Sequence, residues 1–199
     1  TNHTENNSQA LIPLKGEINY TVWSDIVLCP QCGKELCFYK VGIDSQTGHK
    51  KGNAMNCPHC GYVGKTSEFE RAKTIVFDDV SGSTIEVVKE EPVLINYTFG
   101  GKKFDKEPDA DDLSLLERIQ EMPVKEWFPT DSIPDGFNTN QPKKSHLITR
   151  IDLFYEKRSL IAFAKIWNYV EGMKPEYRNI LKFWLQTVSV GFTKTNRYF

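Results

Sequence analysis

Apolar and polar residues alternate through much of the first half of the chain, and this two-residue period predicts β-strands. Turn residues separate these stretches, notably at 44–48, at 78–83 and at Gly100 and Gly101. The charged stretch 102–109 is predicted to be a link. The predicted strands cover residues 18–23, 35–43, 74–77, 84–88 and 93–99, with a short return strand before Cys57.

The second half changes to the three- and four-residue spacing of amphipathic helices. A stripe from Leu113 to Met122 predicts a short helix with aspartates in its first turn, where they suit the helix dipole. Residues 123–145 hold four prolines beside Trp127 and Phe128, so we expect an extended segment pinned by these aromatic rings.

Two longer helices are predicted near the C-terminal end. The first covers about 153–170, with Asp152 as its N-cap and Gly172 as its C-terminal signal, and the second begins near Pro175. Both carry an apolar stripe that amphipathic packing explains without a cofactor pocket, so we expect both stripes to be buried. Their members are Leu160, Phe163, Ile166, Trp167 and Val170, then Tyr177, Ile180, Leu181, Trp184, Leu185 and Val188.

The balance of charge differs between the two ends of the chain. Residues 1–140 carry 14 lysines and arginines against 22 aspartates and glutamates, whereas residues 141–199 carry 11 against 4. The C-terminal part is therefore strongly basic although the net charge of the chain is −1. Such a region suits a face that contacts phosphates, or a surface that balances the acidic half internally, and both interpretations stay open.

Two near-copies of one motif, C-P-x-C-G, are the strongest chemical signal in the sequence, and 24 residues lie between Cys32 and Cys57. Each two-residue gap lets both sulfurs of a pair face one ion, and a tetrahedral zinc ion accepts four thiolates. Proline pre-sets each turn, and glycine accepts the backbone angles that follow. We predict one structural zinc ion per chain, bound by Cys29, Cys32, Cys57 and Cys60.

Other interpretations of the cysteines are weaker. A redox Cys-x-x-Cys usually occurs once, ahead of a helix, and a disulfide framework suits a short secreted chain. This chain has five cysteines; Cys37 is predicted to be a small core residue and His59 an exposed residue of the second motif. Four thiolates leave no position for water, which favours a structural metal over a catalytic one. Reduced or zinc-bound cysteines indicate a cytoplasmic location.

These signals predict an α+β fold: a four-cysteine zinc ribbon with a small antiparallel β-sheet, followed by a helical C-terminal part. Metal binding would supply much of the folding energy of so small a sheet. No stretch approaches the roughly 20 apolar residues of a membrane span. The predicted divisions are a flexible N-terminal segment (1–16), the zinc ribbon and β region (17–101), a linker with the short helix and the proline- and aromatic-rich segment (102–145), and a helical region (146–199).

Motifs that bind phosphates or dinucleotides are missing from the sequence, as is the nucleophile-elbow motif. We therefore assign no catalytic and no cofactor-binding residue. Several segments do resemble the zinc-ribbon insert of bacterial site-specific DNA methyltransferases, the adenine-type enzymes of restriction–modification systems and mobile elements. The resembling segments keep one order and span most of 17–199: residues 18–25 running into 29–35, then 92–97, 127–129 and 154–160.

The resemblance implies a Rossmann-like catalytic domain that binds S-adenosylmethionine through F-x-G-x-G and transfers a methyl group at [DN]-P-P-[YF]. Neither motif occurs here, so the resemblance implies that this chain is the central insert of such a transferase, a fragment that is inactive alone. S-adenosylmethionine would bind only the full-length parent. The four cysteines alone match a functional motif residue by residue. Relatives often show histidines where this chain has 151–153, which leaves their role without a counterpart.

Two functions are compatible with the sequence. The first is DNA binding or target recognition on double-stranded DNA, where basic side chains contact phosphates and position the protein. The second is a structural or protein-interaction module that packs on the catalytic domain or on a partner subunit. Basic residues on one exposed face would favour the first, and basic residues that face the acidic part would favour the second. The candidate phosphate contacts are Lys143, Lys144, Arg150, Lys157 and Arg158.

Overall fold

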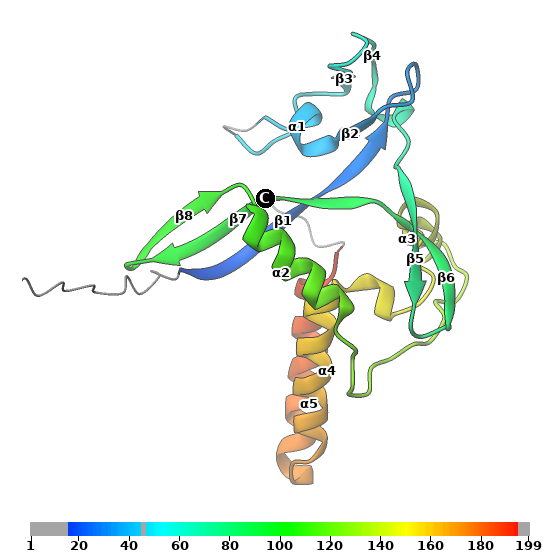
Figure 1. Cartoon of the computed structure of the whole chain (residues 1–199). Coiled ribbons are helices and arrows are strands. Elements are labelled where there is room, and N and C mark those ends of the chain that lie inside the picture. Colours follow the sequence, from blue (N-terminus) through cyan, green and yellow to red (C-terminus); the bar gives the residue numbers. More distant parts are fainter. Residues whose placement is uncertain (1–15, 45–46, 195–199) are drawn as a thin grey trace, which may run out of the picture.

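A computed structural model describes residues 16–44 and 47–194 of the chain (Figure 1). The predicted flexible segment 1–16 lies outside this range except for Gly16. The described residues form an α+β arrangement of antiparallel sheets and helices, with four cysteines gathered at one end. None of the described helices combines the length and apolar character needed to cross a membrane.

The central sheet has the strand order β2-β1-β7-β8, and every pairing in it is antiparallel. Its longest strand, β1 (Glu17–Leu28), pairs with β7 (Glu90–Phe99) over most of its length and with β2 (Glu35–Cys37) at its end. Alternate side chains such as Val93 and Ile95 are buried, as the two-residue period predicts. One strand thus belongs both to the main sheet and to the cysteine-containing end.

The charged stretch after Gly101 was predicted to be a link, and this prediction is wrong. It forms the edge strand β8 (Lys102–Lys106), joined to β7 through Gly100 and Gly101, whose φ angles are 56° and 74°. Phe104 stacks on Tyr97 with their ring centroids 5.6 Å apart. Charged residues on an edge strand discourage further pairing, which explains why this strand has the composition of a link.

Residues 26–72, which we call the cysteine lobe, fold around a small core. The predicted strand 35–43 is only partly correct, because it ends at Cys37 and helix α1 (Phe38–Gly42) follows. The helix lets Phe38 pack against the buried cluster of the lobe. Its other elements are β3 (Ala54–Asn56), β4 (Val63–Lys65) and the short 3-10 helix η1 (Thr66–Glu68).

A two-stranded arm follows the lobe, formed by β5 (Lys73–Asp78) and β6 (Ser83–Val88), and both strands agree with the prediction. Asp78 ends β5 and accepts a hydrogen bond from the backbone N–H of Ser81 at 3.0 Å. The short helix is confirmed as α2 (Ala110–Glu121). Asp109 and Asp112 form a reciprocal capping box at its start.

Residues 123–145 were predicted to be extended, but their last part begins a helix, α3 (Asn140–His146). Pro142 fits there because the first backbone N–H groups of a helix have no partner within the helix. The aromatic contact is present, since the rings of Trp127 and Trp167 lie 6.1 Å apart. A proline is therefore a weaker helix stop at this position than the sequence suggested.

The first of the two long helices is α4 (Lys157–Glu171), which begins four residues later than predicted. Asp152 is not its N-cap, because its carboxylate binds Arg150 and residues 152–154 form the 3-10 helix η2 (Asp152–Phe154). Gly172 is the C-cap of α4, as expected. Helix α5 (Pro175–Ser189) begins at the predicted proline, and η3 (Val190–Phe192) follows it.

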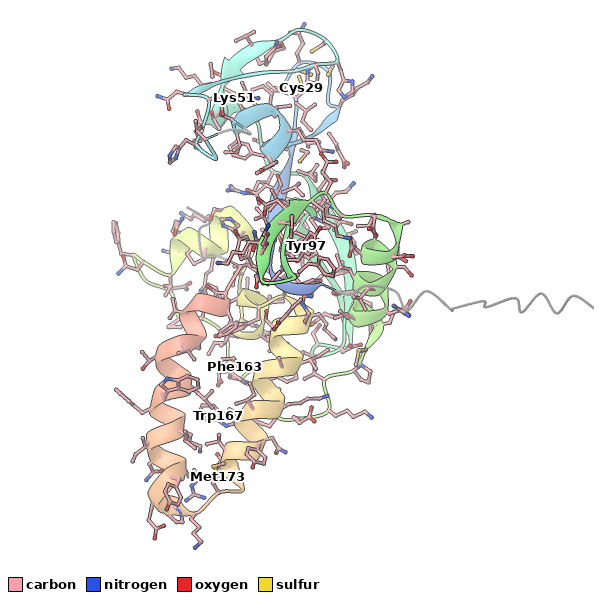
Figure 2. All side chains as sticks on the ribbon, turned by 90° about the vertical axis from the view of Figure 1, so that its left-hand side faces the viewer. Cys29, Lys51, Tyr97, Phe163, Trp167 and Met173 are labelled. Atoms are coloured by element: carbon pink, nitrogen blue, oxygen red, sulfur yellow. The ribbon has the colours of Figure 1, made fainter. Side chains whose placement is uncertain are left out.

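Helices α4 and α5 form a hairpin that extends away from the sheets (Figure 1). Figure 2 shows Met173 near the tip of this hairpin and Cys29 at the opposite end of the molecule. The apolar stripes of the hairpin were predicted to be buried, and this is wrong for several members. Leu185 is buried, whereas the exposed fractions are 47% for Ile166, 61% for Tyr177, 69% for Ile180 and 57% for Trp184.

Candidate functional site

The two C-P-x-C-G motifs fold into matching backbone turns. The backbone N–H of Gly33 donates to the carbonyl of Cys29 at 2.9 Å, and Gly61 does the same to Cys57 at 2.9 Å. Both glycines are left-handed, with φ of 69° and 75°, as the sequence predicted. Each turn lies in its own hairpin, β1–β2 or β3–β4, so two strand pairs hold the two halves of the site.

The four sulfur ligand atoms of Cys29, Cys32, Cys57 and Cys60 all lie within 4.8 Å of one another. Two sulfur pairs span the two motifs: Cys29 and Cys60 are 3.7 Å apart, and Cys32 and Cys57 are 3.8 Å apart. Four sulfurs bound tetrahedrally at about 2.3 Å from one ion lie about 3.8 Å from each other. The four cysteines are thus positioned to bind one metal ion, with spacing compatible with zinc.

The local environment favours the thiolate form of one of these cysteines. Burial raises the pKa of Cys29, but backbone N–H groups of Cys32 and Gln31 outweigh it and lower that pKa to about 7. A backbone contact at Tyr62 lowers the pKa of Cys60, yet burial and the neighbouring sulfurs raise it to about 12. Because the clustered sulfurs oppose each other's ionisation, a bound cation is what would stabilise all four thiolates together.

A small apolar core surrounds the two inner cysteines. Cys29 and Cys57 are 1% and 0% exposed, whereas Cys32 and Cys60 lie at the surface. His59 is exposed and outside the group of four, as predicted. Cys37 is half-buried rather than fully in the core, and its thiol donates to the Ser24 hydroxyl at 3.5 Å. The buried neighbours of the cysteines are Val27, Leu36, Met55 and Phe69.

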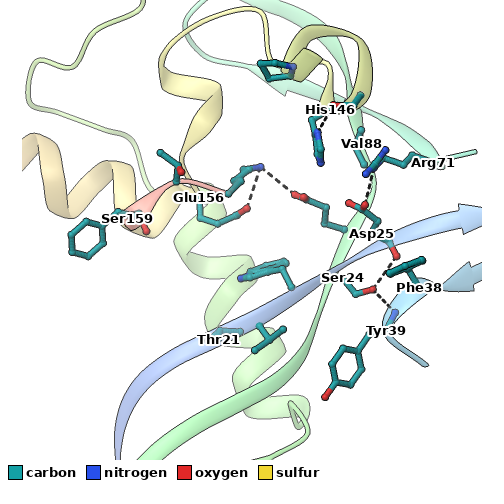
Figure 3. Close-up of a pocket in the computed structure, with 18 of the residues that line it drawn as sticks. Thr21, Ser24, Asp25, Phe38, Tyr39, Arg71, Val88, His146, Glu156 and Ser159 are labelled. Carbon is teal, nitrogen blue, oxygen red and sulfur yellow. Dashed lines mark hydrogen bonds and ion pairs between the residues drawn. The ribbon is translucent and has the colours of Figure 1, made fainter. Parts of the chain in front are cut away.

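A second feature is an open cavity of about 2380 Å³ between the cysteine lobe, β1, the β5 arm and the helices α2 to α5. Eight lysines and arginines line it against four aspartates and glutamates, although the chain as a whole is slightly acidic. Figure 3 shows part of this lining, where β1 supplies Thr21, Ser24 and Asp25 and distant segments supply Arg71, His146 and Glu156.

Three of the four carboxylates in the cavity form ion pairs within the described chain, and two of them share one lysine. Asp25 binds the Arg71 guanidinium at 2.7 Å, and Lys194 lies 3.1 Å from Glu156 and 3.4 Å from Glu90 (Figure 3). Burial lowers the pKa of Lys194, but the two glutamates outweigh it and the pKa lies above its usual value. For Glu90, burial raises the pKa, and the nearby Lys194 does not fully offset this effect.

Four cations of the cavity make no ion pair with any residue that the structure describes. Lys144 and Arg158 are exposed, and Arg158 donates to the Thr21 hydroxyl at 3.4 Å. Lys50 lies over the Phe38 ring, 5.7 Å from its centroid. The fourth is Lys65, at the end of β4. These charges come from four separate segments, so the cavity has an excess of uncompensated positive charge.

The five predicted phosphate contacts do not form one surface. Lys144, Lys157 and Arg158 line the cavity, whereas Lys143 and Arg150 do not. Lys143 binds Asp135 at 2.7 Å, and Lys157 lies 3.4 Å from Asp79. Sequence reasoning missed Lys50 and Lys65, because single lysines on a turn and a short strand carry no pattern that distinguishes them from other surface lysines.

Arg150 has a structural environment instead. Its guanidinium donates two hydrogen bonds to Asp78, at 2.7 and 2.9 Å, and two to Asp152, at 2.8 and 3.0 Å. The three side chains are only 14%, 9% and 5% exposed. The arginine lowers the pKa of Asp78 well below its usual range, with help from Ser81. This group ties the β5–β6 turn to the segment before α4.

Comparison of the chain with protein-family models, with curated proteins and with solved structures gives no match. The resemblance to DNA methyltransferases therefore stays a prediction from the sequence. The geometry itself supports a narrower statement: a four-cysteine group fit for one metal ion, and next to it a cavity with unpaired basic side chains.

Proposed function

We propose that this chain is the zinc-ribbon insert of a site-specific DNA adenine methyltransferase and that it contributes to DNA binding. The zinc ion would be structural, because four thiolates close its coordination shell. Several segments resemble this methyltransferase family and occur in the same order, which supports the family assignment. The spacing of the four sulfurs supports zinc binding. Methyl transfer and S-adenosylmethionine binding would belong to the remainder of the parent chain.

The observation that carries the DNA-binding proposal is the unpaired positive charge in the cavity. Asp25, Glu90 and Glu156 pair with other cations of the cavity, which leaves Lys50, Lys65, Lys144 and Arg158 available to phosphates. Phosphate contacts of this kind supply much of the affinity of DNA-binding proteins and make it salt-dependent. We narrow the predicted contacts accordingly, keeping Lys144 and Arg158 and leaving Arg150 to its structural role.

The test is duplex binding by the zinc-loaded chain at several salt concentrations, followed by fluorescence anisotropy of a labelled DNA. Each phosphate contact contributes about −0.9 to the slope of log affinity against log salt, so four cations give a slope of up to about −3.6. Replacing both Lys144 and Arg158 by alanine is expected to weaken binding and to reduce the magnitude of this slope by about 1.8.

The matched control is Lys143→Ala, which removes the same charge one position away. Lys143 holds Asp135 and lies outside the cavity, so we expect its loss to change the slope by less than the loss of Lys144. If Lys143→Ala and Lys144→Ala change the slope equally, the cavity is not the DNA-binding surface, and binding reflects the overall positive charge of the region. Salt-independent binding, or no binding by a zinc-loaded chain, would contradict the proposal.

A second candidate function is a structural or interaction module that packs on the catalytic domain or a partner. The observation in its favour is that several basic residues of the C-terminal part face acidic residues of the first part. Arg150 binds Asp78, and Lys194 binds Glu90. A zinc-loaded chain that ignores DNA but binds the separately produced catalytic domain would favour this module over the DNA-binding function.

A further inference from the structure

The outward face of α5 carries large apolar side chains that the rest of the described chain leaves exposed. Tyr177, Ile180 and Trp184 follow one another at intervals of three and four residues, so they share one face of the helix. Phe183, 73% exposed, borders this face beside Ile180. Ile166 of the neighbouring helix α4 is 47% exposed and lines the cavity together with Trp184. We call these five residues the hairpin patch.

The patch is large enough to form the centre of a stable interface. An aromatic side chain offers about 150–250 Å², so the exposed parts of the three aromatic residues alone leave roughly 400 Å². With the two isoleucines the apolar area reaches roughly 550 Å². A specific interface of standard size buries about 800 Å² per partner; at the roughly 65% apolar share of homodimer interfaces, this corresponds to roughly 520 Å² of apolar area. The patch therefore supplies about the apolar area that one such interface needs.

We propose that the hairpin patch pairs with the same patch of a second copy of this chain. An interface with two-fold symmetry places equivalent surfaces against each other, so a patch of one charge sign would oppose like charges. The hairpin patch is uncharged in all five of its residues. A partner recognised through charge would instead need charged residues in the patch, and none of the five provides one.

The position of the hairpin suits this pairing. It extends away from the sheets, and the cysteine lobe lies at the other end of the molecule (Figures 1 and 2). Two hairpins packed through α5 would form a four-helix arrangement, in which each helix has two neighbours instead of one. That explains why the apolar stripe of α5 is wider than its contact with α4 requires. The five patch residues differ from the basic residues proposed to contact DNA, although Ile166 and Trp184 also line the cavity.

The test is sedimentation equilibrium of the zinc-loaded chain across a concentration series. The monomer mass is 22.9 kDa, and we expect a reversible transition to twice that mass. Ile180→Glu is expected to raise the dissociation constant at least tenfold, because it places like charges across the two-fold axis. Trp184→Gln, which adds no charge, is the second variant and is expected to weaken the dimer through lost apolar contact alone.

The chain offers a chemically identical control in Ile75→Glu. Ile75 lies on β5, outside the patch, and is 73% exposed against 69% for Ile180. We expect Ile75→Glu to leave the dissociation constant unchanged, and far-ultraviolet circular dichroism checks that each variant keeps its helices. A wild-type chain that stays monomeric at about 100 μM would overturn the proposal. A dimer that Ile180→Glu and Ile75→Glu weaken equally would also overturn it, and so would a dimer that neither substitution weakens.

Discussion

The buried group formed by Arg150, Asp78 and Asp152 allows a quantitative prediction. Replacing Arg150 by methionine keeps a long apolar stem but leaves two nearly buried carboxylates without their cation. Removing one partner of a buried ion pair costs about 3–5 kcal/mol, because the remaining charge stays unsolvated. Domains of this kind have a total stability of about 5–15 kcal/mol, so the loss is a large fraction of the total.

The assay is urea unfolding at pH 7 of zinc-loaded protein, followed by circular dichroism. Lys143→Met is the matched control, because Lys143 pairs with Asp135, whose side chain is 91% exposed, and exposed pairs contribute at most about 1 kcal/mol. We expect Arg150→Met to lower the unfolding free energy by at least 2 kcal/mol more than Lys143→Met. Equal losses would refute the reasoning that burial makes the Arg150 group important.

The same group sets the response of the protein to acid. Arg150 lowers the pKa of Asp78 in the folded state, so the folded state favours the ionised carboxylate more than the unfolded state does. The resulting stabilisation is fully present above the unfolded pKa of about 3.9 and is lost as the pH falls through the lower folded value. Arg150→Met should therefore remove part of the acid dependence below pH 4.

Three further predictions concern the metal and one histidine. Removing zinc with a strong chelator should abolish the protection of backbone amides from hydrogen exchange in β3 and β4, while helices α4 and α5 keep their protection. Unchanged protection in both regions would contradict a cysteine lobe whose folding depends on the metal. Gly61→Ala meets no atom within 4 Å but forces alanine into a φ of +75°, so we expect about 1–2 kcal/mol of strain and a zinc affinity reduced about 5- to 30-fold in a competition titration. Burial and then the charge of Arg71 lower the pKa of His146, so its neutral form is favoured and stability should fall as the pH drops below about 6.5. In the His146→Gln variant, the urea concentration at half-unfolding should change less between pH 7.5 and 5.5 than in the wild type. An unchanged pH dependence in the variant would contradict this role of His146.

The metal site could be predicted from the sequence because its information is local. Two residues between paired cysteines and a glycine after each pair define a turn without reference to the rest of the fold, and both turns formed as expected. The arm strands β5 and β6 and the start of α5 at Pro175 were predicted for the same reason. Period, turn residues and helix signals all lie within a few positions of the element that they specify.

The errors have a common physical cause, which is that partners distant in the sequence decide the outcome. Asp152 is a residue type that often caps helices, but its carboxylate accepts a hydrogen bond from Arg150 instead. The stripe of α5 has the period of a buried face, but the described chain supplies only α4 as its main neighbour, so Trp184 and Ile180 stay exposed. The cavity was equally beyond local reasoning, since Lys50, Lys65 and Lys144 come together only through the fold.

Strand β1 connects the metal site to the cavity. Its twelve residues span roughly 40 Å, and they pass from the cavity wall directly into Cys29 without an intervening loop. The strand pairs with β7 along residues 17–25 and with β2 at residues 26–28, so one continuous backbone segment belongs to the cavity wall and to the cysteine lobe. Ser24 and Asp25 of the cavity therefore lie on the same strand that leads into the first cysteine of the metal site, with Asp25 four residues before Cys29.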